Sequence, residues 1–300
     1  MEPGTLLLVP ALACCALAGW WAGGRVLLAV AWIGLAVWVG FRTADGASSF
    51  TLLALGWSVL VSALFGIVTL VGGMQHFLPR ALVSIGLALA AALALQISSQ
   101  LPAERITGVI EREYRDRVEE WAASADRVLA APEWRSYVAD NPSSEQLMAQ
   151  AEAQLRTLPR PSSLLFPAFL ALQTLAAFGL TWALYHRISR TRLGPPLSPL
   201  RELRFSDQLV WGLIVGITLS VLPSLAELRL LGLNLLLFFG ALYLLRGLGV
   251  LSWYLNPGRA MTALLLVISV ILWPFVGATA LTIGLVDTWA DWRRRARPTP

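Results

Sequence analysis

The stretch FTLLALGWSVLVSALFGIVTLVG, residues 50–72, contains no charged residue. A helix of this length rises about 35 Å, which is enough to cross the roughly 30 Å hydrocarbon core of a bilayer. A chain surrounded by lipid satisfies its backbone polar groups only as a helix or a closed barrel. The stretch therefore predicts a membrane-spanning helix.

Composition extends this interpretation to the rest of the chain. Hydrophobic residues fill 57% of the 300 positions and charged residues only 14%, whereas soluble domains carry about 25% charged residues. The predicted fold is all-α, a polytopic transmembrane helix bundle of eight or nine spans. The apolar runs that predict these spans are 5–22, 26–41, 50–72, 81–97, 163–185, 208–223, 230–253 and 260–288.

Residues 98–162 differ from the rest, because they contain eight arginines and eleven acidic residues. Apolar residues recur every three to four positions in 106–128, which predicts a helix with one apolar stripe that includes Trp121. Acid-before-base pairs at i,i+4 favour the same helix. These pairs are Glu111 with Arg115 and Glu113 with Arg117.

A second helix is expected to begin after Asn141 as cap, with Pro142 in its first turn. Its predicted buried side consists of Leu147, Ala151 and Leu155. Together the two helices predict an extramembrane amphipathic helical hairpin, either packed on itself or lying on the bilayer surface. The expected domains are an N-terminal membrane bundle of about four spans (1–97), this hairpin (98–162) and a C-terminal membrane bundle (163–300).

Arginine positions predict the orientation, because cytoplasmic loops collect basic residues. The loop 186–207 contains five arginines and the tail 293–297 contains four, so both are expected in the cytoplasm. Pro274 is expected to break the last run into a hairpin, near 259–273 and 276–292. The result is nine crossings of a bacterial inner (plasma) membrane, with the N-terminus and the 98–162 hairpin outside and the C-terminus cytoplasmic. Eight crossings with both termini inside is the alternative.

Four motifs in the C-terminal half carry a family resemblance. They are Arg204-Phe205-Ser206-Asp207, Asn234-Leu-Leu-Leu-Phe-Phe, Arg246-Gly247-Leu248-Gly249-Val250 and Gly284-Leu-Val-Asp287-Thr-Trp289 with the arginines that follow. The chain resembles the YybS-like family of predicted membrane proteins, domain of unknown function 2232 (DUF2232). That family has no established activity and is distantly similar to the substrate-binding S components of energy-coupling-factor vitamin transporters. Arg246 departs from the family pattern, which often has glutamine there, and Ser206 stands where proline is frequent.

Polar residues inside apolar runs are costly and mark candidate sites. The candidate ligand-binding residues are Asn234, Arg246, Trp253, Asn256 and Gln173. Asn234 and Gln173 are expected either to hydrogen-bond a neighbouring helix or to contact a ligand. Arg246 either extends to the lipid head groups or binds a ligand.

Two acidic residues receive separate predictions. Asp287 is expected to pair with Arg294 or Arg295 at the end of the last helix, and a proton or cation role is the alternative. Asp207 is expected to cap or begin the sixth span.

Neither a phosphate loop, a nucleophile elbow nor a metal-ligand spacing occurs in the sequence. We therefore expect no enzyme, no catalytic residue, no cofactor and no metal, and we attribute the arginine clusters to topology and anionic lipid rather than to nucleic acid. Two functions remain open. One is small-molecule binding or transport in the manner of an S component, with a pocket near Asn234, Trp253 and Asn256 and with other membrane subunits as partners. The other is a membrane scaffold or regulatory partner that recruits a protein through the 98–162 hairpin.

Overall fold

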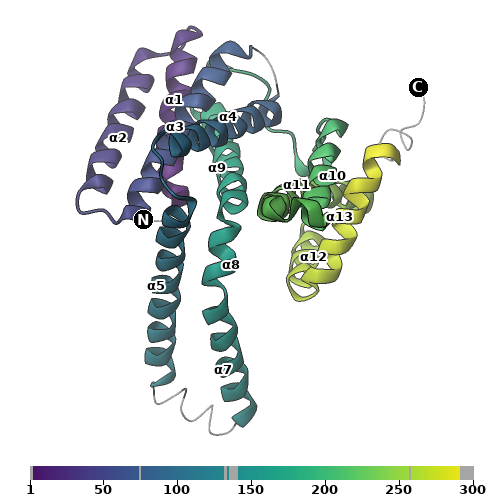
Figure 1. Cartoon of the computed structure of the whole chain (residues 1–300). Helices are drawn as coiled ribbons and strands as arrows, with labels where there is room; N and C mark the ends of the chain where they lie inside the picture. The colour runs from purple at the N-terminus through teal and green to yellow at the C-terminus, as the bar shows by residue number, and fades with distance from the viewer. Residues whose placement is uncertain (1–2, 74–75, 132–133, 135–140, 257, 291–300) are drawn as a thin grey trace.

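The computed structural model describes residues 3–73, 76–131, 134, 141–256 and 258–290, and every regular element among them is a helix. The N-terminal part of the chain folds into four helices, coloured purple to blue in Figure 1. They are α1 (Pro3–Trp21), α2 (Val26–Ala44), α3 (Ser49–Val71) and α4 (Phe77–Ser98). Their bounds lie within a few residues of the predicted apolar runs, because hydropathy over a helical length is a local property of the sequence.

Helix α9 (Phe166–Ile188) completes this bundle by packing against α1 and α4. The Phe178 ring stacks on the Phe65 ring of α3 with 4.1 Å between centroids. Trp182 is fully buried in the same core. The predicted domain boundary placed this segment in the C-terminal bundle. Its aromatic residues instead pack against aromatic rings of α3 and α4. The N-terminal bundle is therefore α1–α4 together with α9.

Between α4 and α9 the chain leaves the bundle and returns to it. Helix α5 (Ala103–Leu129) leads away, and α7 (Pro142–Thr157) and α8 (Pro159–Leu164) lead back (Figure 1). We call α5, α7 and α8 the arm. The predicted ion pairs are present, with 2.8 Å between Arg115 and Glu111 and 3.1 Å between Arg117 and Glu113.

The predicted buried face of the arm is partly wrong. Leu147 and Ala151 of α7 are exposed, and Trp121 of α5 is exposed as well. Within residues 103–127 of α5, the buried residues are Ile110 and Ala122. The reason is that α5 packs mainly against the short helix α8 near the bundle. Helix α7 contacts α5 less, so the apolar side of α7 stays largely uncovered.

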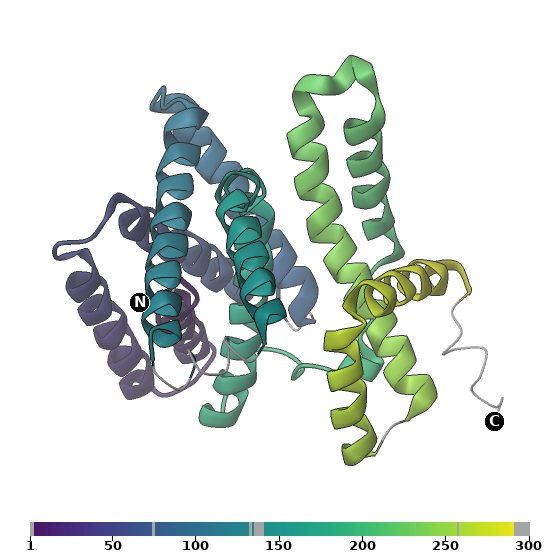
Figure 2. The same cartoon turned by 90° about the horizontal axis from the view of Figure 1, so that it is seen from below.

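The C-terminal unit comprises short 3₁₀ turns and four helices. These are η2 (Asp207–Leu209), α10 (Val210–Val221), η3 (Pro223–Leu228), α11 (Arg229–Leu255), α12 (Arg259–Ile271) and α13 (Trp273–Ala290). Seen from below, α10 stands alongside the first half of α11 (Figure 2). The break predicted at Pro274 lies at the α12–α13 junction, but the two helices turn by 107° there and do not form an antiparallel hairpin.

Five helical stretches in the described part of the chain are long and apolar enough to cross a membrane, or six if the bent α12–α13 pair is one span. They are α2, α3, α4, α9 and the stretch Pro223–Leu255. The apolar parts of α1 and α10 are shorter. Because α10 has 12 residues, it rises only about 18 Å, and the predicted count of eight or nine spans is therefore not confirmed.

Candidate functional site

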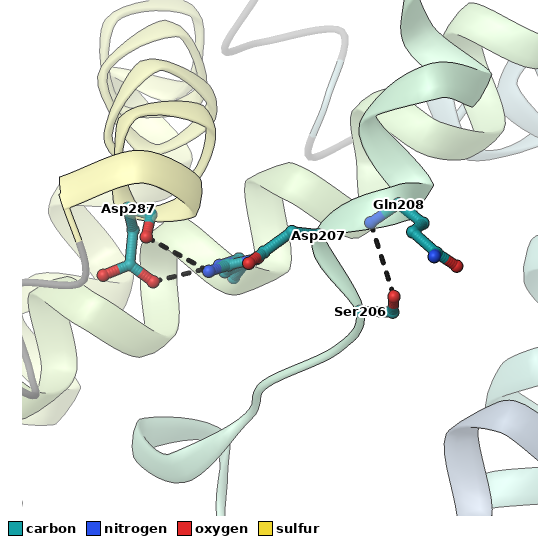
Figure 3. Close-up of polar contacts among 5 residues, drawn as sticks. Ser206, Asp207, Gln208 and Asp287 are labelled. Atoms are coloured by element: carbon teal, nitrogen blue, oxygen red, sulfur yellow. Dashed lines mark hydrogen bonds and ion pairs between the residues drawn. The ribbon is translucent and has the colours of Figure 1, made fainter.

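A buried arginine lies at the centre of the C-terminal unit. Arg246 of α11 is 5% exposed. Its Nε donates a hydrogen bond to Oδ2 of Asp287 at 2.9 Å, and its Nη2 donates to the Asp287 carbonyl oxygen at 3.2 Å (Figure 3). Its Nη1 donates to Oδ1 of Asp207 at 3.1 Å. Every nitrogen of this guanidinium is thus engaged by the protein itself.

Aromatic rings complete the surroundings of this guanidinium. The Arg246 carbon Cζ lies 5.2 Å from the centroid of the Phe205 ring, a cation–π distance. The Phe205 ring in turn meets the ring of buried Tyr243 edge to face, at 5.2 Å. The charge is therefore enclosed on one side by carboxylates and on the other by an aromatic face.

Two glycines bring α11 and α13 close enough for this contact. A Cβ atom added to Gly247 would collide with the carbonyl oxygen of Ala280, and one added to Gly284 would collide with that of Tyr243. Small residues allow apolar helices to approach at backbone distance when no hydrophobic force drives them together. Gly284 lies about one turn before Asp287, so the close contact of α13 with α11 places the Asp287 carboxylate within hydrogen-bond distance of Arg246.

The two carboxylates of this cluster differ in environment. The Asp287 side chain is 1% exposed, whereas that of Asp207 is 64% exposed. One arginine and two aspartates give the cluster a formal charge of −1. Removing one partner of a buried ion pair leaves an uncompensated charge and typically costs about 3–5 kcal/mol. The cluster therefore joins α11, α13 and the segment before α10. Arg246 lies 41 residues before Asp287 and 39 residues after Asp207 in the sequence.

Sequence reasoning did not find these pairings. Asp287 engages Arg246 of α11, and its predicted pairing with Arg294 or Arg295 stays a prediction, because these arginines lie outside the described residues. Asp207 opens η2 as expected, but the cap is Ser206, whose Oγ accepts from the Gln208 N–H at 3.4 Å (Figure 3). One feature of the sequence could have predicted the pairing of Arg246 with Asp287. The two residues carry opposite charges inside separate apolar runs, and such charges tend to pair in the folded protein.

Three of the four C-terminal motifs thus meet at one point. The family model for predicted membrane proteins of domain of unknown function 2232 matches residues 6–288. The chain belongs to the DUF2232 family. Neither a curated protein nor a solved structure matches it.

Asn234 in this DUF2232 protein makes the interhelical contact that was one of its two predicted roles. Its Oδ1 accepts from the Ala168 N–H at 3.0 Å, in the first turn of α9. Its Nδ2 donates to the carbonyl oxygens of Leu164 at 3.0 Å and Leu230 at 2.9 Å. The amide therefore ties α11 to the α8–α9 junction, where its Oδ1 shares the Ala168 N–H with the carbonyl oxygen of Leu165.

The other candidates of the DUF2232 chain lie apart from one another. Gln173 is on an exposed face of α9, and Trp253 is half-buried near the end of α11. Asn256 is the C-cap of α11 in the left-handed conformation, with φ 38°, a position that asparagine tolerates well. On the straight path of α11, Asn234 and Asn256 are separated by about 33 Å. The structure does not bring the five candidates around one small-molecule pocket, and their ligand roles remain predictions.

Proposed function

We propose that this DUF2232 protein is a non-catalytic membrane subunit that recruits another protein through the arm. The observation that carries the proposal is the exposure of large apolar side chains on the arm. Trp121 of α5 is 52% exposed and Leu147 of α7 is 66% exposed, with Met148 beside it. Aromatic residues and methionine are enriched in the cores of protein interfaces, so these side chains suit a protein partner.

Charge supports a position of the arm in water. The segment 98–162 contains eight arginines and eleven acidic residues, and each charged side chain placed in hydrocarbon would cost several kcal/mol. Because apolar side chains in water gain free energy when covered, an aqueous arm with Trp121 and Leu147 exposed is a surface for association.

The base of the arm is fixed to the bundle. The Tyr114 ring lies 6.5 Å from the Phe166 ring of α9, and the Arg117 guanidinium lies 5.6 Å from the Phe50 ring of α3. Partial burial raises the pKa of Tyr114 above its ordinary value. A rigid base presents α5, which has 27 residues and a length of about 40 Å, at a defined direction to a partner.

The proposed location is the bacterial inner membrane, with the arm outside and the C-terminus in the cytoplasm. The basic loop 186–207 and the basic tail support this orientation through the positive-inside rule. A single cysteine placed at residue 130, in a variant with Cys14 and Cys15 replaced by serine, tests it. A membrane-impermeant thiol reagent should label residue 130 from outside intact cells, and labelling only after lysis would refute the orientation.

Native mass spectrometry of the gently purified full chain tests the recruitment. We expect a stoichiometric protein partner that is lost in the variant Trp121→Glu/Leu147→Glu. The matched control Gln146→Glu/Gln150→Glu adds the same charge at exposed polar positions of α7 and should keep the partner. A wild-type chain that carries no protein, or a partner that survives the first variant, contradicts the proposal.

A second candidate is small-molecule binding or transport in the manner of an S component. The observation that favours it is the charge cluster of Arg246, Asp207 and Asp287, because ionisable residues among apolar helices often line substrate or ion pathways. The energy would come from partner membrane subunits. The same spectra decide this candidate: a bound small molecule or a co-purified coupling subunit supports it, and the absence of both from several detergents rejects it.

A further inference from the structure

A second buried arginine lies in the N-terminal bundle and has no acidic partner among the described residues. Arg80 is the fourth residue of α4 and is 0% exposed. Its Nη2 donates to the carbonyl oxygen of Gly73, and its Cζ lies 5.2 Å from the centroid of the Trp182 ring. Its Nε and Nη1 have no hydrogen-bond partner within the described part of the protein. Arg80 is thus enclosed by helices.

The helices around Arg80 carry no acidic residue in their described parts. The described helices that form this bundle, α1–α4 and α9, contain no aspartate or glutamate. Asp45 follows α2, at the opposite end of α3, which has 23 residues and therefore separates the two ends by about 34 Å. A buried guanidinium without a counter-charge costs several kcal/mol, so the site is complete only when an anion from outside the bundle is added.

Helix geometry makes the same place favourable for an anion. Arg80 lies in the first turns of α4, at the positive end of the helix dipole. The N-cap residue His76 makes no side-chain capping bond in the described structure, which leaves the first N–H groups of α4 available as donors. Thr69 of α3 and Thr181 of α9 are buried in the same bundle, and their hydroxyls have no partner among the described residues.

The loop after α9 folds over this end of the bundle and brings more positive charge. The Trp182 Nε1 donates to the carbonyl oxygen of Pro195 at 3.0 Å, and His186 Nε2 lies 3.0 Å from the carbonyl oxygen of Gly194. Arg187, Arg190 and Arg192 belong to this segment. A surface lined by one sign of charge raises the local concentration of the opposite ion.

We propose that Arg80 is the central cation of a binding site for a phosphate group, at the end of the bundle formed by the start of α4 and the ends of α3 and α9. Nη2 shares one edge of the guanidinium with Nε and another with Nη1, and each edge presents two N–H donors in the fork geometry that binds phosphate oxygens. The anion replaces the neutral Gly73 carbonyl as partner of Nη2. Gly73 has φ 58° and follows Gly72, and glycine gives these two positions backbone freedom. The phosphate comes either from a lipid head group or from a soluble ion.

Two measurements on the purified full chain test the site. In micelles of a maltoside detergent, which contains no phosphate, the thermal midpoint is followed while inorganic phosphate replaces chloride at constant ionic strength. In a second arm, phosphatidylglycerol is titrated into these micelles and retained lipid is counted by native mass spectrometry. A shift in the first arm identifies a soluble phosphate, and one retained phosphatidylglycerol in the second identifies a lipid, because ligands stabilise the state that binds them.

Variants connect the result to Arg80. Arg80→Gln should weaken the binding at least tenfold, and Arg80→Lys, which keeps the charge but loses the fork, should weaken it less. Exposed Arg25, in the α1–α2 loop at the same end of the bundle, provides the control, and Arg25→Gln should bind like the wild type. The proposal is overturned if the wild type responds in neither arm, or if Arg80→Gln and Arg80→Lys both respond as the wild type does. The wild-type measurement decides even if Arg80→Gln does not fold.

Discussion

The N-terminal bundle and the C-terminal unit each bury one arginine among apolar helices, and they treat it in opposite ways. Arg246 has a protein partner for every guanidinium nitrogen, and two of its partners are aspartates. Arg80 has a single carbonyl partner and an aromatic face, and no carboxylate lies on the described helices of its bundle. The first arginine therefore joins helices, whereas the second is left with unused donors.

This difference shows why burial of a charge does not by itself define a site. The charge of Arg246 is balanced by aspartates of the same protein, so the residue stabilises the contact between α11 and α13. The charge of Arg80 is balanced only when an anion binds to the protein. A polar residue within a membrane protein is thus better judged by its unsatisfied donors than by its depth.

Removing Arg246 should produce the largest effect. Arg246→Met removes the cation that donates two hydrogen bonds to buried Asp287, so we expect a loss of about 3–5 kcal/mol in the free energy of unfolding, measured in mixed detergent micelles. The double variant Arg246→Met/Asp287→Asn should recover most of this loss. Arg229→Gln, at an exposed position of the same helix, should stay within about 0.5 kcal/mol of the wild type. A small loss for Arg246→Met would remove the contrast between the two arginines.

The next effect concerns the close approach that delivers Asp287. Gly247→Ala should lower the free energy of unfolding by about 1–3 kcal/mol, because the added Cβ meets the Ala280 carbonyl oxygen and pushes α13 away. Gly240 on the same helix has nothing within 4 Å of an added Cβ. Gly240→Ala should therefore stabilise the protein by about 0.5–1 kcal/mol through its helix propensity. Equal effects at the two glycines would mean that α11 and α13 do not touch there.

Asn234 connects the two regions, and its removal should be milder. Asn234→Ala deletes the bonds to Ala168 and Leu164, and we expect a loss of about 1.5 kcal/mol. Gln173→Ala, on an exposed face of α9, is the control and should be neutral. Hydrogen exchange at the Ala168 amide should also accelerate in the Asn234 variant. Unchanged protection there would show that the connection is absent.

The smallest effect should have the opposite sign. Arg80→Met in detergent, without phosphate or anionic lipid, should stabilise the bundle by about 1 kcal/mol, because an apolar side chain of similar length replaces an unpaired buried charge. Adding phosphatidylglycerol should then favour the wild type. The reference measurement is the loss in Arg246→Met under the same conditions. A loss of several kcal/mol in Arg80→Met would show that Arg80 has the structural role of Arg246.

The sequence predicted most helices and the break at Pro274 correctly. Its prediction of which residues of the arm are buried was less accurate. Its i,i+4 ion pairs are local and were predicted with both partners, but the buried face of α7 was wrong. A repeat of three to four residues shows that a helix has an apolar side. It does not show whether another helix is near enough to cover that side.

The sequence by itself determined that this chain is a helical membrane protein of the DUF2232 family and where its apolar helices run, because hydropathy over some 20 residues is decided locally. Only the tertiary structure decided that α9 joins the N-terminal bundle, that Arg246 meets Asp207 and Asp287, and that Arg80 lies buried without a carboxylate. Residues 39 and 41 positions apart meet through the packing of whole helices, and no local pattern encodes which faces will touch.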